Sequence, residues 1–253
     1  MDLNMWSDAA SSYKSATQIA RVLTESWVES NLRSPCHTDS LKPFKASTRL
    51  KDFRCGTCGA EYQLKSQQTR FGKRLTGAEY KTSFAAAKQG RFPSLLLLQR
   101  DASWNVINLT AVHRANITPE MIEPRKPLSE TARRAGWQGC HINLERIPVA
   151  GQIAMIVDRR PNDPQAIVKA WSRIGRISSV PTRGRTWTLD VLRFVELLPE
   201  NFALSDAYTF ERELASLHPE NRIVRPKIRQ QLQVLRDQNL IEFVSPGQYR
   251  RLT

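Results

Sequence analysis

The chain has 253 residues, of which 40% are hydrophobic and 25% are charged, and this composition is typical of a globular protein with a sizeable core. No apolar run reaches the ~18 residues of a membrane span, and the N-terminal segment lacks the order of a signal peptide. We therefore expect a cytoplasmic protein without a membrane partner. The net charge of +14 favours a polyanionic partner, and nucleic acid is the first candidate.

The first predicted element is a helix over residues 15–28, because Ile19, Leu23 and Trp27 recur every four residues and form one apolar face. Downstream, helical and strand patterns alternate, which predicts a mixed α/β layer around a central sheet. The elements expected there are a hairpin of strands over 49–55 and 60–66, a basic loop over 68–81, a helix over 83–89, and strands in "SLLLLQ", "NVINLTAV" and "GQIAMIVD".

Residues 173–185 are polar and basic, contain Pro and Gly, and show no apolar period, so they predict a linker. Behind this segment the pattern predicts three helices and a hairpin with a Pro-Gly turn. That order is typical of a winged helix. The predicted helices cover residues 187–198, 205–217 and 226–239, and the hairpin is "LIEFVSPGQYRRL".

The third of these helices has the pattern of a recognition helix. Ile228, Leu232 and Leu235 mark its buried face, which leaves a polar face for DNA. Gln can read adenine in the major groove, and Arg or Lys can read guanine or bind phosphate. A merely solvated face would carry the same residue types. The candidate DNA contacts in this domain are Lys227, Arg229, Gln230, Gln233 and, in the wing, Arg250.

The strand over 60–66 carries a candidate catalytic face. Because side chains alternate along a strand, Glu61, Gln63 and Lys65 share one side, which we expect to face an open cleft. The hairpin can bring Asp52 beside them. A carboxylate, a second oxygen ligand and a lysine could bind a divalent metal and activate water for phosphodiester hydrolysis. A solvated strand face explains the same spacing, and explains it better on spacing alone.

The turn of the same hairpin carries Cys55 and Cys58, which have the spacing of a zinc knuckle. Cys36 and His37 are the nearest upstream candidates to complete the ligand set, although another fourth ligand or a water would also serve. The alternative is a pair of reduced cysteines in a turn. Cys140 is far away in the sequence and is expected to be a buried apolar thiol.

Residues 124–140 combine four Lys or Arg residues with Pro, Gly and a tryptophan. Arg133 and Arg134 could bind phosphates while Trp137 presents a flat apolar surface to a base. A core tryptophan beside a surface loop is the plainer alternative.

These segments together resemble the DpnI type of restriction endonuclease, which cuts GATC only when its adenine carries the Dam methyl group. The similar blocks are "ATQIARVLTESWV", "DFRCGTCGAEYQLKS", "RKPLSETARRAGWQGCHINL", "KIRQQLQVLRDQNLIEF" and "GQYRRL", so the resemblance covers nearly the whole chain. It implies a PD-(D/E)XK nuclease domain with a structural Zn²⁺ over residues 1–180 and a winged-helix domain over residues 181–253.

The resemblance also implies a catalytic pattern of Asp and then Glu-x-Lys with Mg²⁺, and the matching positions here are Asp52, Gln63 and Lys65. Gln63 replaces the glutamate of the pattern, so one negative charge is missing from the Mg²⁺ ligands. The zinc clamp also departs, because Ser34 stands near the place of a cysteine, and His37 becomes a better substitute. Trp137 matches the aromatic residue of the family's pocket for the methyl group.

The sequence therefore predicts an Mg²⁺-dependent, methyl-directed type II restriction endonuclease that hydrolyses duplex DNA at GATC sites containing N6-methyladenine. We expect it to be a monomer that acts in a restriction system. Two alternatives remain open. One is a methyl-dependent DNA-binding protein whose nuclease is weakened by Gln63. The other is a winged-helix regulator with a zinc-bearing accessory domain.

Overall fold

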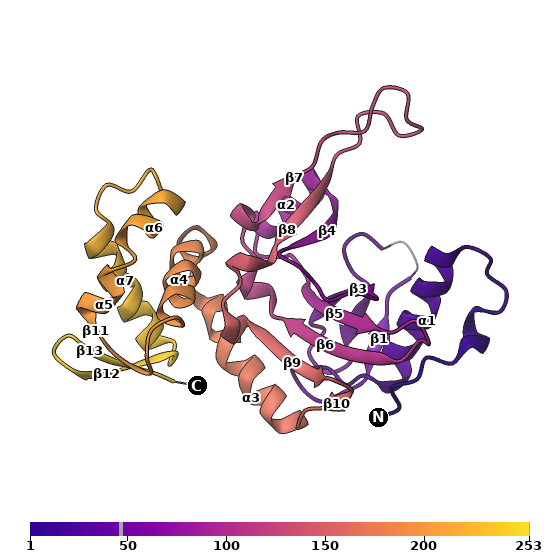
Figure 1. The fold of residues 1–253 in the computed structure, drawn as a ribbon, viewed down its shortest axis with the longest axis horizontal. Helices are drawn as coiled ribbons and strands as arrows, with labels where there is room; N and C mark the ends of the chain where they lie inside the picture. Colours follow the sequence, from indigo (N-terminus) through magenta and orange to yellow (C-terminus); the bar gives the residue numbers. More distant parts are fainter. Residues whose placement is uncertain (46–47, 253) are drawn as a thin grey trace.

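The computed structural model describes residues 1–45 and 48–252, and its largest element among them is a seven-stranded sheet (Figure 1). Neighbouring strands are antiparallel except for β3 and β5, which are parallel. In order across the sheet, the strands are β1 (Leu41–Pro43), β2 (Phe53–Cys55), β3 (Glu61–Gln67), β5 (Ser94–Arg100), β6 (Val106–Val112), β9 (Gln152–Val157) and β10 (Arg160–Pro161).

Two helices pack against this sheet. Helix α1 (Ala16–Asn31) contacts β1 and β3, and Leu23 and Trp27 of its apolar face are each 2% exposed, as the sequence predicts. Helix α3 (Pro164–Gly175) packs on β9. The Asp163 carboxylate caps α3 by accepting a hydrogen bond from the Ala166 amide at 2.9 Å. The mixed α/β class is confirmed, although α3 itself is not among the predicted elements.

A second sheet, of three strands among the described residues, stands beside the first in the order β4 (Arg74–Glu79), β8 (Gly139–Asn143) and β7 (Ile122–Pro124). Helix α2 (Tyr80–Lys88) packs against all three strands. The expectation of a loop over 68–81 is therefore wrong for its second half, because β4 gains its hydrogen bonds from the distant β8. Between β7 and β8, residues 125–138 form an arm that projects from the body (Figure 1).

The C-terminal part is a winged helix, as predicted. It contains α4 (Thr182–Val195), α5 (Leu204–Tyr208), α6 (Glu211–Leu217), α7 (Val224–Asp237), β11 (Asn201–Ala203), β12 (Ile241–Ser245) and β13 (Gln248–Arg251). The single helix expected over 205–217 is split at Phe210, whose ring stacks on Phe194 with centroids 4.8 Å apart. In α7, Ile228, Leu232 and Leu235 are fully buried.

The prediction of a linker over residues 173–185 is also wrong, because most of this segment is helical. α3 continues to Gly175, a 3₁₀ turn follows, and α4 begins at Thr182. Ile174 and Ile177 are buried, and the Arg185 guanidinium donates hydrogen bonds to the carbonyl oxygens of Ser178 and Val180. The burial of these two isoleucines and the hydrogen bonds of Arg185 stabilise helical structure in a segment whose composition resembles a linker.

Ionic contacts join α4 to the sheet domain. Asp190 is fully buried and pairs with Arg146 of the sheet domain and with His218 of the winged helix, the latter at 2.9 Å. The Glu196 carboxylate accepts hydrogen bonds from the amides of Val149 and Ala150 at 2.7 and 2.8 Å. The winged helix is thus docked on the sheet domain by buried charges.

The remaining helical turns are short 3₁₀ segments, at Ser7–Ala10, Arg114–Asn116, Pro119–Met121, Leu144–Arg146, Val149–Gly151 and Arg176–Ser179. Within residues 1–45 and 48–252, no helix combines the length and the apolar character that crossing a membrane requires.

Candidate active site and metal cluster

The β2–β3 hairpin brings Asp52 and Gln63 together. Phe53 pairs with Tyr62 across the hairpin, so Asp52, one residue earlier, lies opposite Gln63 on the same face of the sheet. The Leu64 amide donates a hydrogen bond to the Asp52 carboxylate at 2.7 Å. This bond fixes the orientation of the carboxylate relative to β3.

Gln63 lies in the floor of the site and is 7% exposed. The expected open cleft is therefore wrong at this position. Helix α1 packs on β3, and strand alternation alone could not show this packing. The Gln63 Oε1 atom has no hydrogen-bond partner among the described residues. A buried amide oxygen without a partner is costly, and a metal ion would supply that partner.

Lys65 follows on the same face, beside Leu97 of β5. Burial lowers the pKa of Lys65, while the negative charge of Asp52 opposes this shift. Burial also raises the pKa of Asp52, against the Leu64 amide and the positive charge of Lys65. Burial thus disfavours the charged form of each group, while the attraction between the two charges favours it.

Helix α1 adds two charged residues that the sequence patterns do not single out. The positive charge of Arg21 lowers the pKa of Asp52 and also that of Glu25, one turn further along α1. Glu25 is half-buried, and burial is the main cause that raises the pKa of its carboxyl group. Its helical position was visible in the sequence, but its proximity to Asp52 depends on the packing of α1 on β3.

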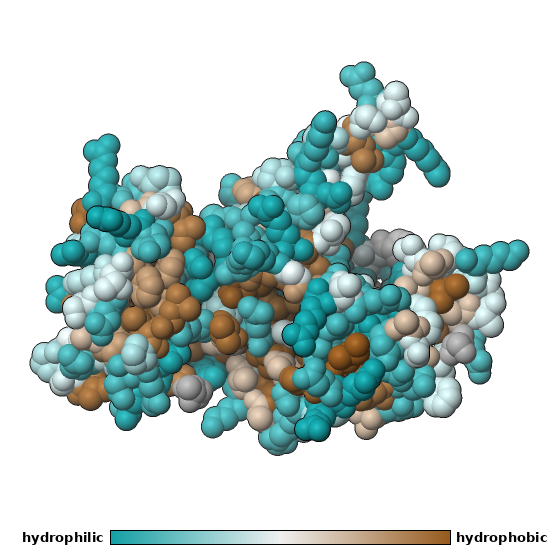
Figure 2. Space-filling model, viewed as in Figure 1, coloured by the Kyte–Doolittle hydropathy of each residue, from teal (hydrophilic) through white to brown (hydrophobic). Residues whose placement is uncertain are grey.

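A groove of about 700 Å³ lies over the neighbouring strands of the sheet and includes Leu97, the residue of β5 that pairs with Lys65. Its floor includes Leu97 and its neighbour Thr110 on β6, and Arg70 and Lys73 of the basic loop line its side. Figure 2 shows the arm standing clear of the N-terminal region, with a gap between the two. In the ribbon view, β3 runs below that gap (Figure 1).

The arm carries the predicted DNA contacts Arg133, Arg134 and Trp137, and Trp137 lies two residues before β8 begins at Gly139. The Arg134 guanidinium lies 4.9 Å from the centroid of the Trp137 ring. The ring is half-buried and packs against Gly139, where a Cβ atom would lie only 3.0 Å from it. Trp137 is thus neither a core residue nor fully exposed, and Arg133 is exposed.

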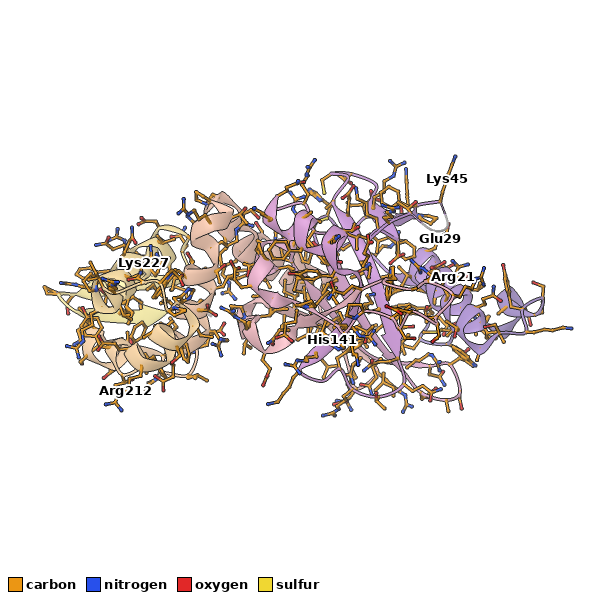
Figure 3. All side chains as sticks on the ribbon, turned by 90° about the horizontal axis from the view of Figure 1, so that it is seen from above. Arg21, Glu29, Lys45, His141, Arg212 and Lys227 are labelled. Atoms are coloured by element: carbon orange, nitrogen blue, oxygen red, sulfur yellow. The ribbon has the colours of Figure 1, made fainter. Side chains whose placement is uncertain are left out.

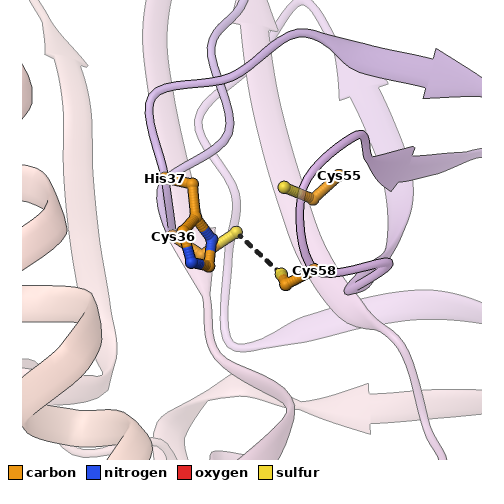
Figure 4. Close-up of side chains that lie close together, drawn as sticks. All are labelled: Cys36, His37, Cys55 and Cys58. Atoms are coloured by element: carbon orange, nitrogen blue, oxygen red, sulfur yellow. Dashed lines mark hydrogen bonds between the residues drawn. The ribbon is translucent and has the colours of Figure 1, made fainter.

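Cys55 and Cys58 at the hairpin turn form a cluster with Cys36 and His37, which lie between α1 and β1 (Figure 4). One ligand atom from each residue lies within 4.8 Å of the others, and the sulfur atoms of Cys36 and Cys58 are 3.6 Å apart. Soft thiolates with one imidazole form a donor set typical of zinc. The structure therefore brings together all four residues that the sequence suggests as zinc ligands.

Two hydroxyl groups surround these sulfur atoms. Ser34 Oγ lies 3.4 Å from Cys55 Sγ, and Tyr62 Oη lies 3.1 Å from Cys36 Sγ. Burial raises the pKa of Cys36. For Cys55, burial is outweighed by hydrogen bonds from Ser34 and from nearby backbone amides, which lower the pKa of the thiol. Cys140 is fully buried elsewhere, as expected.

The winged helix presents an exposed polar face on α7, where Arg229, Gln230 and Gln233 are exposed. Figure 3 labels Lys227, whose ammonium donates a hydrogen bond to Gln230 Oε1 at 2.7 Å. In the wing, Arg250 pairs with Glu242 of the neighbouring strand at 2.6 Å. The structure thus gathers four of the predicted contacts on α7 and holds the fifth, Arg250, in an ion pair.

Comparison with known families agrees with this architecture. The model of the Dam-replacing family, named DpnI, matches residues 1–180, and the model of the Dam-replacing HTH domain matches residues 183–251. The resemblance to DpnI-type restriction endonucleases is thereby confirmed over almost the whole chain. The chain belongs to the Dam-replacing family and carries the helix-turn-helix domain of that family at its C-terminal end.

Proposed function

We propose that the protein is a divalent-metal-dependent endonuclease that hydrolyses a phosphodiester bond of duplex DNA at adenine-methylated GATC sites. The observation that carries the proposal is the unpartnered Oε1 atom of buried Gln63 beside the Asp52 carboxylate and the half-buried Lys65. Carboxylate and amide oxygens suit Mg²⁺. Asp52 and Gln63 would hold this ion, which when bound would polarise the phosphate and neutralise its developing charge.

The chain's own residues prepare the reaction. The Leu64 amide keeps the Asp52 carboxylate aligned. Lys65 follows Gln63 on the same strand face and lies within the electrostatic reach of Asp52, and we assign to its Nζ the role of orienting the attacking water. Gln63 is buried and Lys65 is half-buried, and this partial withdrawal from water strengthens the electrostatic interactions within the site.

Affinity and specificity for DNA would come from two surfaces. We assign residues 1–180 to the nuclease domain and residues 181–253 to the winged-helix domain. The arm of the nuclease domain would bind phosphates through Arg133 and Arg134 and bury the adenine methyl group against Trp137. One methyl contact is worth only about 0.8 kcal/mol, so reading the mark again on α7 would multiply the discrimination.

The cysteine cluster supports a structural Zn²⁺ at the hairpin turn, held by Cys36, His37, Cys55 and Cys58. Tyr62 Oη and Ser34 Oγ would then donate hydrogen bonds to thiolates, which is the usual support of a zinc site. Elemental analysis of the purified protein tests this assignment. A folded protein without bound metal would reject it.

The function is tested by incubating the full-length protein with Mg²⁺ and plasmids from Dam-positive and Dam-negative hosts. Cleavage of the methylated plasmid alone is the expected result. Lys65→Ala should lose cleavage by at least about a hundredfold, since general acid–base groups contribute that much or more. Lys169→Ala is the matched control, because Lys169 is exposed on α3.

A second candidate function is favoured by the neutral side chain of Gln63, which removes one ligand charge. In that case the protein binds methylated DNA without cutting it. Tight methyl-dependent binding with no cleavage at high Mg²⁺ or Mn²⁺ would support the binding protein and reject the nuclease.

A further inference from the structure

The groove beside the candidate active site contains residues to which the proposed function gives no role. It lies over β5, β6 and β9, and its Leu97 pairs with Lys65 of β3. Thr110 of β6 pairs with Leu97 in turn, so the groove continues the sheet face that carries Lys65. A DNA strand whose scissile phosphate reaches the candidate metal site would therefore pass close to the groove.

Apolar side chains form much of the groove lining. Leu97 and Ile156 of the sheet and Leu144 after β8 are buried residues of this lining. Phe71 lines the groove from the basic loop and is half-buried, so part of its surface remains accessible. Apolar surface offers nothing to a phosphate, whereas a nucleobase has an apolar face that stacks on aromatic side chains.

The charged side chains of the groove balance one another. Arg70 and Lys73 bring positive charge to it, Glu145 and Asp158 bring negative charge, and Lys73 pairs with Glu145 at 2.7 Å. A lining with balanced charge does not attract a run of phosphates as a basic surface does. It suits one nucleotide, because the exposed Arg70 can bind a single phosphate and a carboxylate can accept a hydrogen bond from an amino group of a base.

A chain of hydrogen bonds fixes the polar part of the lining. The Asp158 amide donates to Asn108 Oδ1 at 2.9 Å, and Asn108 Nδ2 donates to Gln99 Oε1 at 2.8 Å. Gln99 Nε2 donates in turn to the carbonyl oxygen of Gln68 at 3.2 Å. These bonds link β9, β6 and β5 to the loop that carries Phe71. A wall held in this way needs little ordering on binding, which lowers the entropic cost of capturing a ligand.

We propose that the groove binds one nucleotide of the DNA substrate, unstacked from the duplex, with its base against Phe71 and its phosphate at Arg70. The proposal rests on the proposed function, because the nucleotide belongs to the same DNA. The methylated adenine is assigned to Trp137, so the captured nucleotide is an unmethylated one close to the scissile phosphate. The groove volume of about 700 Å³ lies in the range of small-molecule sites.

The test uses duplexes with a methylated GATC site and a single fluorescent aminopurine base, moved in turn through the unmethylated positions of the site and its flanks. Ca²⁺ replaces Mg²⁺, so that the full-length protein binds without cutting. Aminopurine fluoresces strongly only when it is unstacked. Binding of the wild type should raise the fluorescence several-fold at one position, because the base there leaves the stack.

Variants of Phe71 separate stacking from structural support. Phe71→Leu keeps an apolar side chain but removes the aromatic face, so the captured base should be at least about fivefold less populated. Phe71→Trp should retain the fluorescence rise, whereas a merely structural Phe71 would tolerate leucine better than tryptophan. Tyr13→Leu, at an exposed aromatic residue before α1, is the matched control and should behave as the wild type does. Circular dichroism verifies that each variant is folded.

The outcomes distinguish this inference from the proposed function. Duplex binding without a fluorescence rise at any probed position would overturn the inference even if the wild type cleaves methylated DNA, and so would a rise that Phe71→Leu leaves intact. A rise that Phe71→Leu removes, in a protein that never cleaves DNA with Mg²⁺, would reject the nuclease and leave the nucleotide site standing. A wild type that does not bind the duplex would reject both.

Discussion

Glutamate is the residue that the catalytic pattern expects at position 63. Replacing Gln63 by glutamate should lower the stability of the fold without metal and should increase the stabilisation that a bound metal ion provides. The side chain is 7% exposed and faces Asp52, so a carboxylate there is desolvated and repelled. Each unit by which folding raises the pKa of the introduced group costs about 1.4 kcal/mol. Buried carboxyl groups often shift by two units or more, so we expect metal-free Gln63→Glu to lose about 3 kcal/mol at pH 8.

The loss of stability in Gln63→Glu should depend on pH. Because the pKa of the introduced group is raised on folding, the folded state binds the extra proton, and the loss of stability is small near pH 4. The loss grows as pH rises and reaches its full size above the folded pKa. A non-cleaving ion such as Ca²⁺, at about 100 times its dissociation constant, should restore about 2.7 kcal/mol by binding the folded state alone.

Urea unfolding at pH 5 and pH 8, with and without Ca²⁺, measures these changes. Gln68→Glu is the matched control, because Gln68 is exposed in the loop after β3. The reasoning would be refuted if Gln63→Glu were as stable as the wild type at pH 8 without metal, or if Ca²⁺ stabilised both proteins equally. In DNA cleavage, Gln63→Glu should need less Mg²⁺ than the wild type.

Three further predictions concern other parts of the molecule. Trp137→Ala should reduce the preference for methylated over unmethylated duplex about fourfold, which corresponds to one methyl contact, as measured by fluorescence anisotropy. Tyr62→Phe should weaken Zn²⁺ binding by about tenfold in a chelator competition, because Cys36 loses its hydroxyl neighbour. Burial lowers the pKa of His113 to about 4 from 6.5. The contribution of neutral His113 to the free energy of unfolding is therefore full above pH 6.5 and is lost as pH falls toward 4. Unfolding free energy should fall by roughly 3 kcal/mol over that range, and His113→Asn, which can still accept the Ala115 hydrogen bond, should flatten the dependence.

Local patterns predict the hairpin that carries the site. Alternation along β3 and the short Cys-rich turn are enough to place Asp52, Gln63 and Lys65 on one face. The β2 strand is shorter than expected because Leu50 adopts a left-handed conformation, with φ of 63°, and ends the extended run early. The resemblance to a known family then indicates that this polar face, rather than another, is the candidate catalytic one.

Long-range contacts account for what the sequence does not reveal. β4 contains one apolar residue that is buried, Leu75, so its strand nature depends on pairing with β8 across more than 60 residues. Glu25 lies in a predicted helix, but the packing of that helix on β3 is a long-range contact that the sequence does not reveal. The burial of Gln63 is likewise a property of the folded structure that strand alternation cannot express.

Consecutive residues of β3 serve different sites, because Tyr62 points to the cysteine cluster and Trp171 while Gln63 points to Asp52. A slip of the hairpin by one residue would exchange these two side chains between the faces of the sheet. The phenol would then enter the catalytic face, and the amide would face the sulfur atoms. Cys55 and Cys58 lie at the turn that sets this register. The Zn²⁺ that we propose there would keep the hairpin in register, so its removal should misalign Asp52 and Gln63 before it unfolds the domain.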